Sequence, residues 1–448
     1  MNLNSQSQFT DEELEFYPED LRSAPDSLLL KKLRDELHSR TFPVFVSPVV
    51  VCSYSYLRTT ASIAEEKSHV ETLIQMTSVA LVSQNTNRMR LAGEHFNLRV
   101  DFYNEFTCYQ FIFQDKPETD FKHDLMSLVP HQWRQEISGT PLAAMNFITQ
   151  KCLTNDVDKT KLLDYFGDVQ IMGSYTSHGA AKAWSNFIAD GDKHIHVLVE
   201  DEQLGPRRLG RLIQRLIDIE NYRMMSLLSL PVAQKTLLQI ERIEGELTRI
   251  VMQLSDMGSM EHETNLLNYL YKLAAQNEQL RAQTLHRFSA STAYQVILDE
   301  RLVEIEDVAI EGYQTISRFF SRRMRPALRT CDSAQKRLEQ LSNHLQRVTE
   351  MLSTSVNVCV GKQNQNMLES LAQQSKMQLR LQQTVEGLSI VAITYYSSSL
   401  LSYFFKSLEK LELISSPYLW SGLSVPIIAT LTWFGLRWLK TRALKPEL

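Results

Sequence analysis

Glycine, proline and paired cysteines are scarce in this chain, and each scarcity excludes a class of protein. The 448 residues include 15 glycines and 13 prolines, too few for an all-β protein with many tight turns, so we expect long helices. The five cysteines form no Cys-x-x-Cys pair, which argues against a disulfide framework and against a zinc site built on such pairs. A formal net charge of −5 gives no reason to expect nucleic-acid binding.

Motifs with familiar chemistry are missing as well. The chain has no glycine-rich phosphate loop, no Gly-x-Ser-x-Gly elbow and no His-Glu-x-x-His sequence. Its first residues are polar and acidic, without the basic and apolar regions of a secretory signal. We therefore expect a protein that is not an enzyme, that has no cofactor or metal, and whose bulk stays in the compartment where it is made.

Two long uncharged runs stand out near the C-terminus, at residues 387–405 and 413–436. Each is long enough to cross the bilayer as a helix. Basic residues flank the pair on both outer sides, and fewer lie in the connecting loop, so the positive-inside rule places both ends in the cytoplasm. These patterns predict a transmembrane hairpin at 386–437 in the bacterial inner membrane, followed by a basic cytoplasmic tail at 438–448. Two buried core helices are the alternative.

Polar side chains inside the first run are expensive in lipid and should face a partner helix or water. The candidates for intramembrane contacts or for a pore lining are Glu386, Tyr395, Tyr396, Ser397, Ser398 and Ser399. A contact between two anchoring helices is the alternative to a pore.

Upstream of the uncharged runs, the apolar spacing is helical. Residues 205–385 read as a long-helix bundle or stalk, and no proline occurs between Pro326 and Pro417, so one helix is expected from near Ala327 into the first run. A seam with alternating spacings of three and four is typical of a coiled coil, packed either within one chain or between copies. Its residues are Leu338, Leu341, Leu345, Val348 and Leu352.

The first 200 residues have a different character. A flexible acidic segment at 1–30 precedes a mixed α/β domain at 31–204, which makes the predicted fold class α+β. Runs rich in β-branched and aromatic residues predict strands, and two stretches between them predict helices. The predicted strands lie within 42–57, 98–113, 168–175, 180–190 and 193–201, and the predicted helices at 63–82 and 121–137.

Three groups of polar residues invite a chemical interpretation. Glu36, His38 and Arg40 could form an acid–base cluster, although they also suit a helix end. His194 and His196 point to one face of a strand, but a metal needs a further ligand that the sequence does not show. Near a helix N-terminus, where anions are favoured, Arg208, Arg211 and Arg215 share a face, and Arg215 could instead pair with Asp218.

Several stretches together resemble a bacterial family of uncharacterised membrane-anchored proteins, the domain-of-unknown-function three-four-two-two group. They are "DELHSRTFP", "NEFTCYQFIF", "LGPRRLGRLIQRLIDIENYRMMSLLSLP", "RTCDSAQKRLEQLS" and "QLRLQQTVEGLSIVAITYY". The resemblance implies a C-terminal membrane anchor and implies no activity or site. The layout is also loosely similar to that of CorA-type channels, but "SYFFKSLEKLEL" stands where their Gly-Met-Asn would follow the first span.

These observations predict a membrane-anchored, non-enzymatic scaffold or interaction subunit with a large cytoplasmic domain. Its expected partners are the lipid bilayer, further copies of itself in a homo-oligomer and an unidentified protein, with no nucleic acid. A CorA-like ion channel and a cryptic metal-dependent or hydrolytic enzyme are the alternative functions.

Overall fold

The computed structural model describes residues 41–114, 121, 124–152, 157–254, 260–409 and 416–443. The chain divides into two compact units, one made of residues 1–252 and 271–346 and the other of residues 253–270 and 347–448. The two longest helices, Met260–Glu304 and Ile316–Glu409, therefore each contribute residues to both units. The boundaries predicted from the sequence lie after residues 30, 204, 385 and 437, and they divide the chain into consecutive segments.

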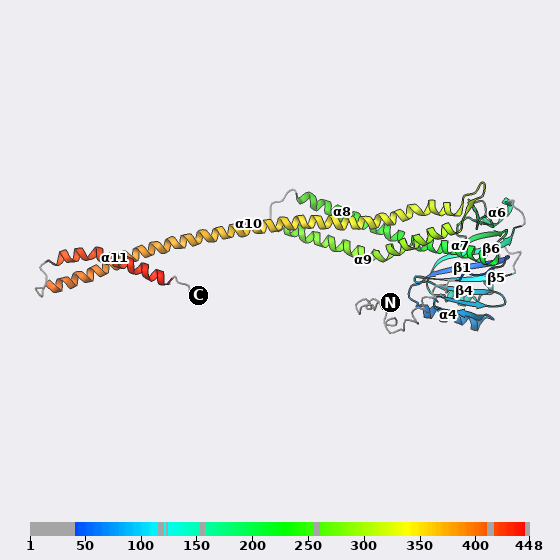
Figure 1. Ribbon diagram of the computed structural model, residues 1–448, viewed down its shortest axis with the longest axis horizontal. Coiled ribbons are helices and arrows are strands. Elements are labelled where there is room, and N and C mark those ends of the chain that lie inside the picture. Colours follow the sequence, from blue (N-terminus) through cyan, green and yellow to red (C-terminus); the bar gives the residue numbers. More distant parts are fainter. Residues whose placement is uncertain are drawn as a thin grey trace, which may run out of the picture. The chain divides into compact units, whose positions relative to one another are not determined.

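A ten-stranded sheet forms the centre of the first unit (Figure 1). Its order is β10-β7-β8-β9-β6-β1-β5-β4-β3-β2, and all neighbours are antiparallel except β6 and β9. The strands are β1 (Val49–Leu57), β2 (Ala80–Gln84), β3 (Arg88–Ala92), β4 (Asn97–Phe102), β5 (Phe106–Gln114), β6 (Thr140–Lys151), β7 (Met172–Thr176), β8 (Ala181–Ser185), β9 (Ile195–Asp201) and β10 (Val308–Ala309).

Both faces of the sheet bury apolar side chains, because successive residues of a strand point to opposite sides. On one face, Val49 and Val51 of β1 pack in a cluster with Leu212 and Leu216 of helix α7 (Pro206–Leu227). On the other, Val50 of β1 packs in a second cluster under α4 (Ile63–Met76), α5 (His131–Gln135) and α6 (Lys159–Phe166). The domain is thus mixed α/β, as the sequence predicted.

Two predicted helices end earlier than expected. The capping box of Ser62 and Glu65 starts α4, but the helix stops at Met76, and the following residues form strand β2 at the sheet edge. The stretch at 121–137 splits at Pro130 into a short 3-10 helix (η1, Leu125–Leu128) and α5, since proline cannot continue the hydrogen-bond ladder. Strands β3 and β6 and helix α6 were not predicted at all.

The long helices follow the predicted periodicity more closely. After α7 come α8 (Ser229–Gln253), α9 (Met260–Glu304), α10 (Ile316–Glu409) and α11 (Pro417–Ala443). Helix α7 ends at Leu227, Leu228 is its C-cap, and α8 begins at Ser229 with Pro231 in its first turn. Between α9 and α10 the chain leaves the helical path to add β10 beside β7, which the helical pattern at 293–324 did not indicate.

Helix α10 is continuous for 94 residues and contains Pro326, so the single helix predicted from near Ala327 begins even earlier. The side chains of the predicted seam are all buried within the chain: Leu338, Leu341, Leu345, Val348 and Leu352. Of the two packings that the sequence left open, the structure therefore has the one within a single chain.

Candidate functional site

The three arginines predicted to bind an anion lie along α7. Gly205 caps this helix with an extended backbone, and Pro206 occupies its first turn. Arg208 and Arg211 are exposed. Arg215 is engaged elsewhere, because its Nε lies 3.0 Å from Glu304 Oε2 and its Nη1 donates to the Glu304 carbonyl at 2.8 Å. Its partner on α9 is therefore Glu304 rather than Asp218.

Two hydrogen bonds and an ion pair connect the sheet to α7 and α9 through Asp218. Gln110 Nε2 of β5 donates to Gln214 Oε1 at 3.0 Å, and Gln214 Nε2 donates to Asp218 Oδ1 at 2.8 Å. The other oxygen, Asp218 Oδ2, lies 3.5 Å from Arg301 Nε. Arg301 in turn donates through Nη1 to Glu304 Oε1 at 2.6 Å.

Burial raises the pKa of Asp218 to about 6, although the bond from Gln214 and the charge of Arg301 act in the opposite direction. The carboxyl group therefore titrates near neutral pH inside the domain. Sequence reasoning missed it, since only the tertiary fold places Gln110 next to α7.

The two histidines lie next to β9 and on it, and Asp190 joins them. His196 Nε2 is 2.8 Å from Asp190 Oδ2, and His194 Nδ1 is 3.9 Å from Asp190 Oδ1. His194 Nε2 is 3.0 Å from the Tyr54 hydroxyl. The side chains of His194 and His196 are largely buried, at 18% and 14% exposed.

Hydrogen bonds and burial hold this cluster of two imidazoles and one carboxylate in place. Burial lowers the pKa of His194 and keeps the ring neutral. Burial alone would raise the pKa of Asp190, but bonds from the His194 amide and from His196 outweigh it and lower that pKa. Across the described ranges, no group of three or more histidine, cysteine, aspartate or glutamate side chains could hold a metal ion.

Glu36, His38 and Arg40 lie outside the described residues, and the described chain begins at Thr41 beside the sheet. The Thr41 carbonyl accepts a hydrogen bond from Arg88 Nη1 at 2.8 Å. Phe45 donates through its amide to the Pro206 carbonyl at 3.1 Å. The segment after the "ELHSR" stretch is thus fixed against the start of α7.

The polar residues predicted to lie in the membrane occupy the last third of α10. Tyr395 and Tyr396 are exposed, and their rings lie 5.7 Å apart edge to face. Glu386 and Ser397 to Ser399 are half-buried, and Ser398 Oγ donates to the Thr394 carbonyl at 2.6 Å. The Oγ1 atoms of Thr394 on α10 and Thr432 on α11 are 3.3 Å apart.

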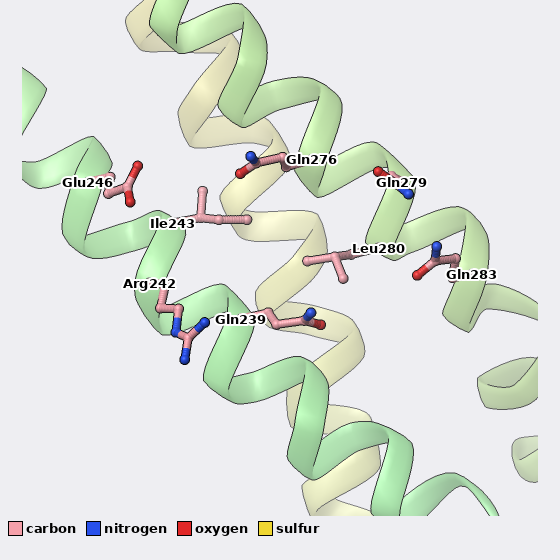
Figure 2. Close-up of a pocket in the computed structure, with 8 residues that line it drawn as sticks. All are labelled: Gln239, Arg242, Ile243, Glu246, Gln276, Gln279, Leu280 and Gln283. Carbon is pink, nitrogen blue, oxygen red and sulfur yellow. The ribbon is translucent and has the colours of Figure 1, made fainter.

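A polar groove of about 300 Å³ lies between α8 and α9 (Figure 2). Figure 2 shows Gln239 and Ile243 on one helix facing Gln276 and Leu280 on the other, with a third helix behind them. Amides are both donors and acceptors, so the groove offers hydrogen bonds, and Arg242 and Glu246 at its edge carry one charge of each sign. No group in it has the arrangement of a nucleophile and base within the described residues.

Within the described ranges, one helix is long and apolar enough to cross a membrane. This helix is α10, whose most apolar window of 18 residues has a mean hydropathy of 1.3 with none of it buried. The core helix of a soluble protein can be equally long and apolar. Helix α10 differs from such a helix because its apolar window is exposed.

The fold and the sites define a class of protein in which a mixed α/β domain is joined to long helices. The longest helix, α10, carries an exposed apolar stretch. The chain belongs to the family described as "Protein of unknown function (DUF3422)", whose model matches residues 28–443. The predicted family is thereby confirmed. No curated protein matches the chain, and the resemblance to CorA-type channels receives no support.

Proposed function

We propose that this protein is a membrane-anchored interaction subunit that associates with further copies of itself through α10. In this proposal the end of α10 and helix α11 form a transmembrane hairpin in the bacterial inner membrane, with both termini cytoplasmic. The exposed apolar window of α10 and the contact between Thr394 and Thr432 support the hairpin. The basic residues that flank the two apolar segments support the orientation.

The observation that carries self-association is the exposed stretch of α10 at residues 361–385. Every residue in this stretch is exposed in the single chain. In proteins most of the stability of a helix comes from packing of an apolar face, and the apolar side chains of this stretch gain nothing by facing solvent. A partner helix would remove them from water.

Several apolar residues of this stretch, with Leu388 just beyond it, lie on a seam distinct from the buried one, while Leu368, Met377 and Leu379 are exposed beside it. The seam positions alternate spacings of four and three, as in a coiled coil. They are Met367, Leu371, Gln374, Gln378, Leu381, Val385 and Leu388. The five apolar members are between 51% and 70% exposed. Two successive glutamines can pair with their own copies, because an amide both donates and accepts.

Charge placement favours a second copy of this chain as the partner. Between 361 and 385 the charged residues are Lys362, Glu369, Lys376 and Arg380. The first three are seven residues apart. All four lie on the face of the helix opposite the seam. The positions that flank the seam are uncharged. Identical parallel helices therefore meet no like charges. Two copies anchored in one membrane with the same topology would also be parallel.

Light scattering of the detergent-extracted chain, with micelle mass subtracted, tests the proposal. We expect an oligomer at micromolar protein. Leu381→Lys places a charge in the seam and should dissociate it, whereas Gln383→Lys adds the same charge on the outer face and should not. Circular dichroism controls for helix content. A monomeric wild-type chain, or equal effects of the two lysines, would rule out this interface.

A further inference from the structure

Three arginines gather on one face of the sheet, at strands β3 and β4. In the register of this pair, Arg90 stands directly opposite Arg99, and Arg88 stands opposite Asp101. Side chains directly opposite on an antiparallel pair lie about 4.5–5.5 Å apart at Cβ, and like charges there are destabilising. The pairing of Arg90 with Arg99 therefore calls for a compensating negative charge.

One carboxylate in this cluster pairs with two of the arginines. Asp101 Oδ1 pairs with Arg88 Nε, and Asp101 Oδ2 accepts from Arg99 Nε at 2.8 Å. Within the part of the chain that the structure describes, the side chain of Arg90 forms no hydrogen bond or ion pair. Its guanidinium therefore adds a positive charge beside a carboxylate that two other arginines already use.

A cavity of about 200 Å³ lies beside these arginines. Its polar lining is made by Arg90, Arg99, Asn97 and Gln114, and residues 43–45 form part of its wall. Since one water occupies about 30 Å³ in the liquid, the space holds several waters or a small oxyanion. Arg99 is only 5% exposed, so its guanidinium is fixed before any ligand arrives.

We propose that this cavity binds an oxyanion, the phosphate or carboxylate group of a small molecule, between Arg90 and Arg99. Guanidinium groups bind such groups through two parallel N–H···O bonds. The bound oxyanion would supply a negative partner for the Arg90 guanidinium, and Gln114 and Asn97 would offer further amide donors. The proposal is independent of the membrane anchor and of self-association.

The arginines singled out by the sequence make a weaker site. Arg208 and Arg211 are exposed on α7, and Arg215 is engaged with Glu304. By contrast, Arg90 and Arg99 face a common cavity. The two locations make different predictions for the same ligand, which allows one experiment to separate them.

Isothermal titration of the full detergent-extracted chain with inorganic phosphate, at constant ionic strength, tests the site, and acetate serves as the carboxylate probe. We expect saturable binding at millimolar concentration or below. Binding of phosphate alone would assign a phosphate ligand, and binding of both would support a general oxyanion site. Arg90→Gln should weaken binding at least tenfold, and Arg208→Gln should leave it unchanged.

Urea unfolding of both variants controls for folding, and Arg90 is suited to substitution because it is exposed on the sheet. The proposal is overturned if neither anion binds to the wild-type chain. It is equally overturned if Arg208→Gln weakens binding as much as Arg90→Gln, because the anion would then sit on α7.

Discussion

The fold moves the pKa of Asp218 into the range near neutral pH. Its ordinary pKa is about 3.9, and burial raises it to about 6. Between these values the native chain binds more protons than the unfolded chain. The contribution of Asp218 to stability is therefore full below pH 4 and is lost as the pH rises through about 6.

Asp218→Asn should abolish this pH dependence, because asparagine keeps an acceptor for Gln214 and does not titrate. Relative to the variant, the wild-type chain should lose at most about 3 kcal/mol of unfolding free energy between pH 4 and pH 7. Urea unfolding at several pH values, followed by the fluorescence of the buried Trp133 and Trp184, measures the difference. A difference that does not vary with pH would contradict the raised pKa.

At the scale of elements, helix α7 fits against the chain that precedes β1. A Cβ placed on Gly210 would lie 1.8 Å from the Pro43 carbonyl oxygen, whereas a Cβ on Gly245 of α8 would meet nothing within 4 Å. Both glycines are inside helices, so helix propensity alone treats them alike.

Gly210→Ala and Gly245→Ala should therefore have opposite effects. Gly245→Ala should raise the free energy of unfolding by up to about 1 kcal/mol through helix propensity. Gly210→Ala should lower it by about 1–3 kcal/mol, because backbone atoms must move apart. Thermal or urea unfolding of the two variants measures both changes. Similar stabilisation by both would mean that residues 43–45 do not pack tightly on α7.

The proposed topology belongs to the scale of the whole molecule. We expect a cysteine introduced at Ser416, between α10 and α11, to react with a membrane-impermeant maleimide in intact cells. A cysteine at Leu448 should react only after permeabilisation. The parent chain, whose five cysteines lie outside the predicted loop and tail, is the control for background labelling. Labelling of the tail with protection of Ser416 would reverse the topology.

The sequence by itself determined the features that depend on residues close along the chain. A helix bonds each residue to one four positions away, so periodicity predicted the long helical region after residue 205, although not the segment with β10 that separates α9 from α10. The strands β4 and β5 were equally recognisable, because they are adjacent in sequence and pair with each other across a short polar turn. The family and the uncharged C-terminal runs likewise need no partner segment to be recognised.

Only the tertiary structure decided features that join distant residues. Strand β6 pairs with β1 and, in parallel, with β9, and no local pattern encodes such a partner. The seam at Leu345 looks the same in sequence whether it packs within a chain or between copies, and its burial settled that question. Gln110 of β5 joins Gln214 of α7, and Arg215 of α7 joins Glu304 of α9, although each pair is far apart in sequence. Burial and long-range pairing are properties of the folded chain, since they depend on what the rest of the molecule places nearby.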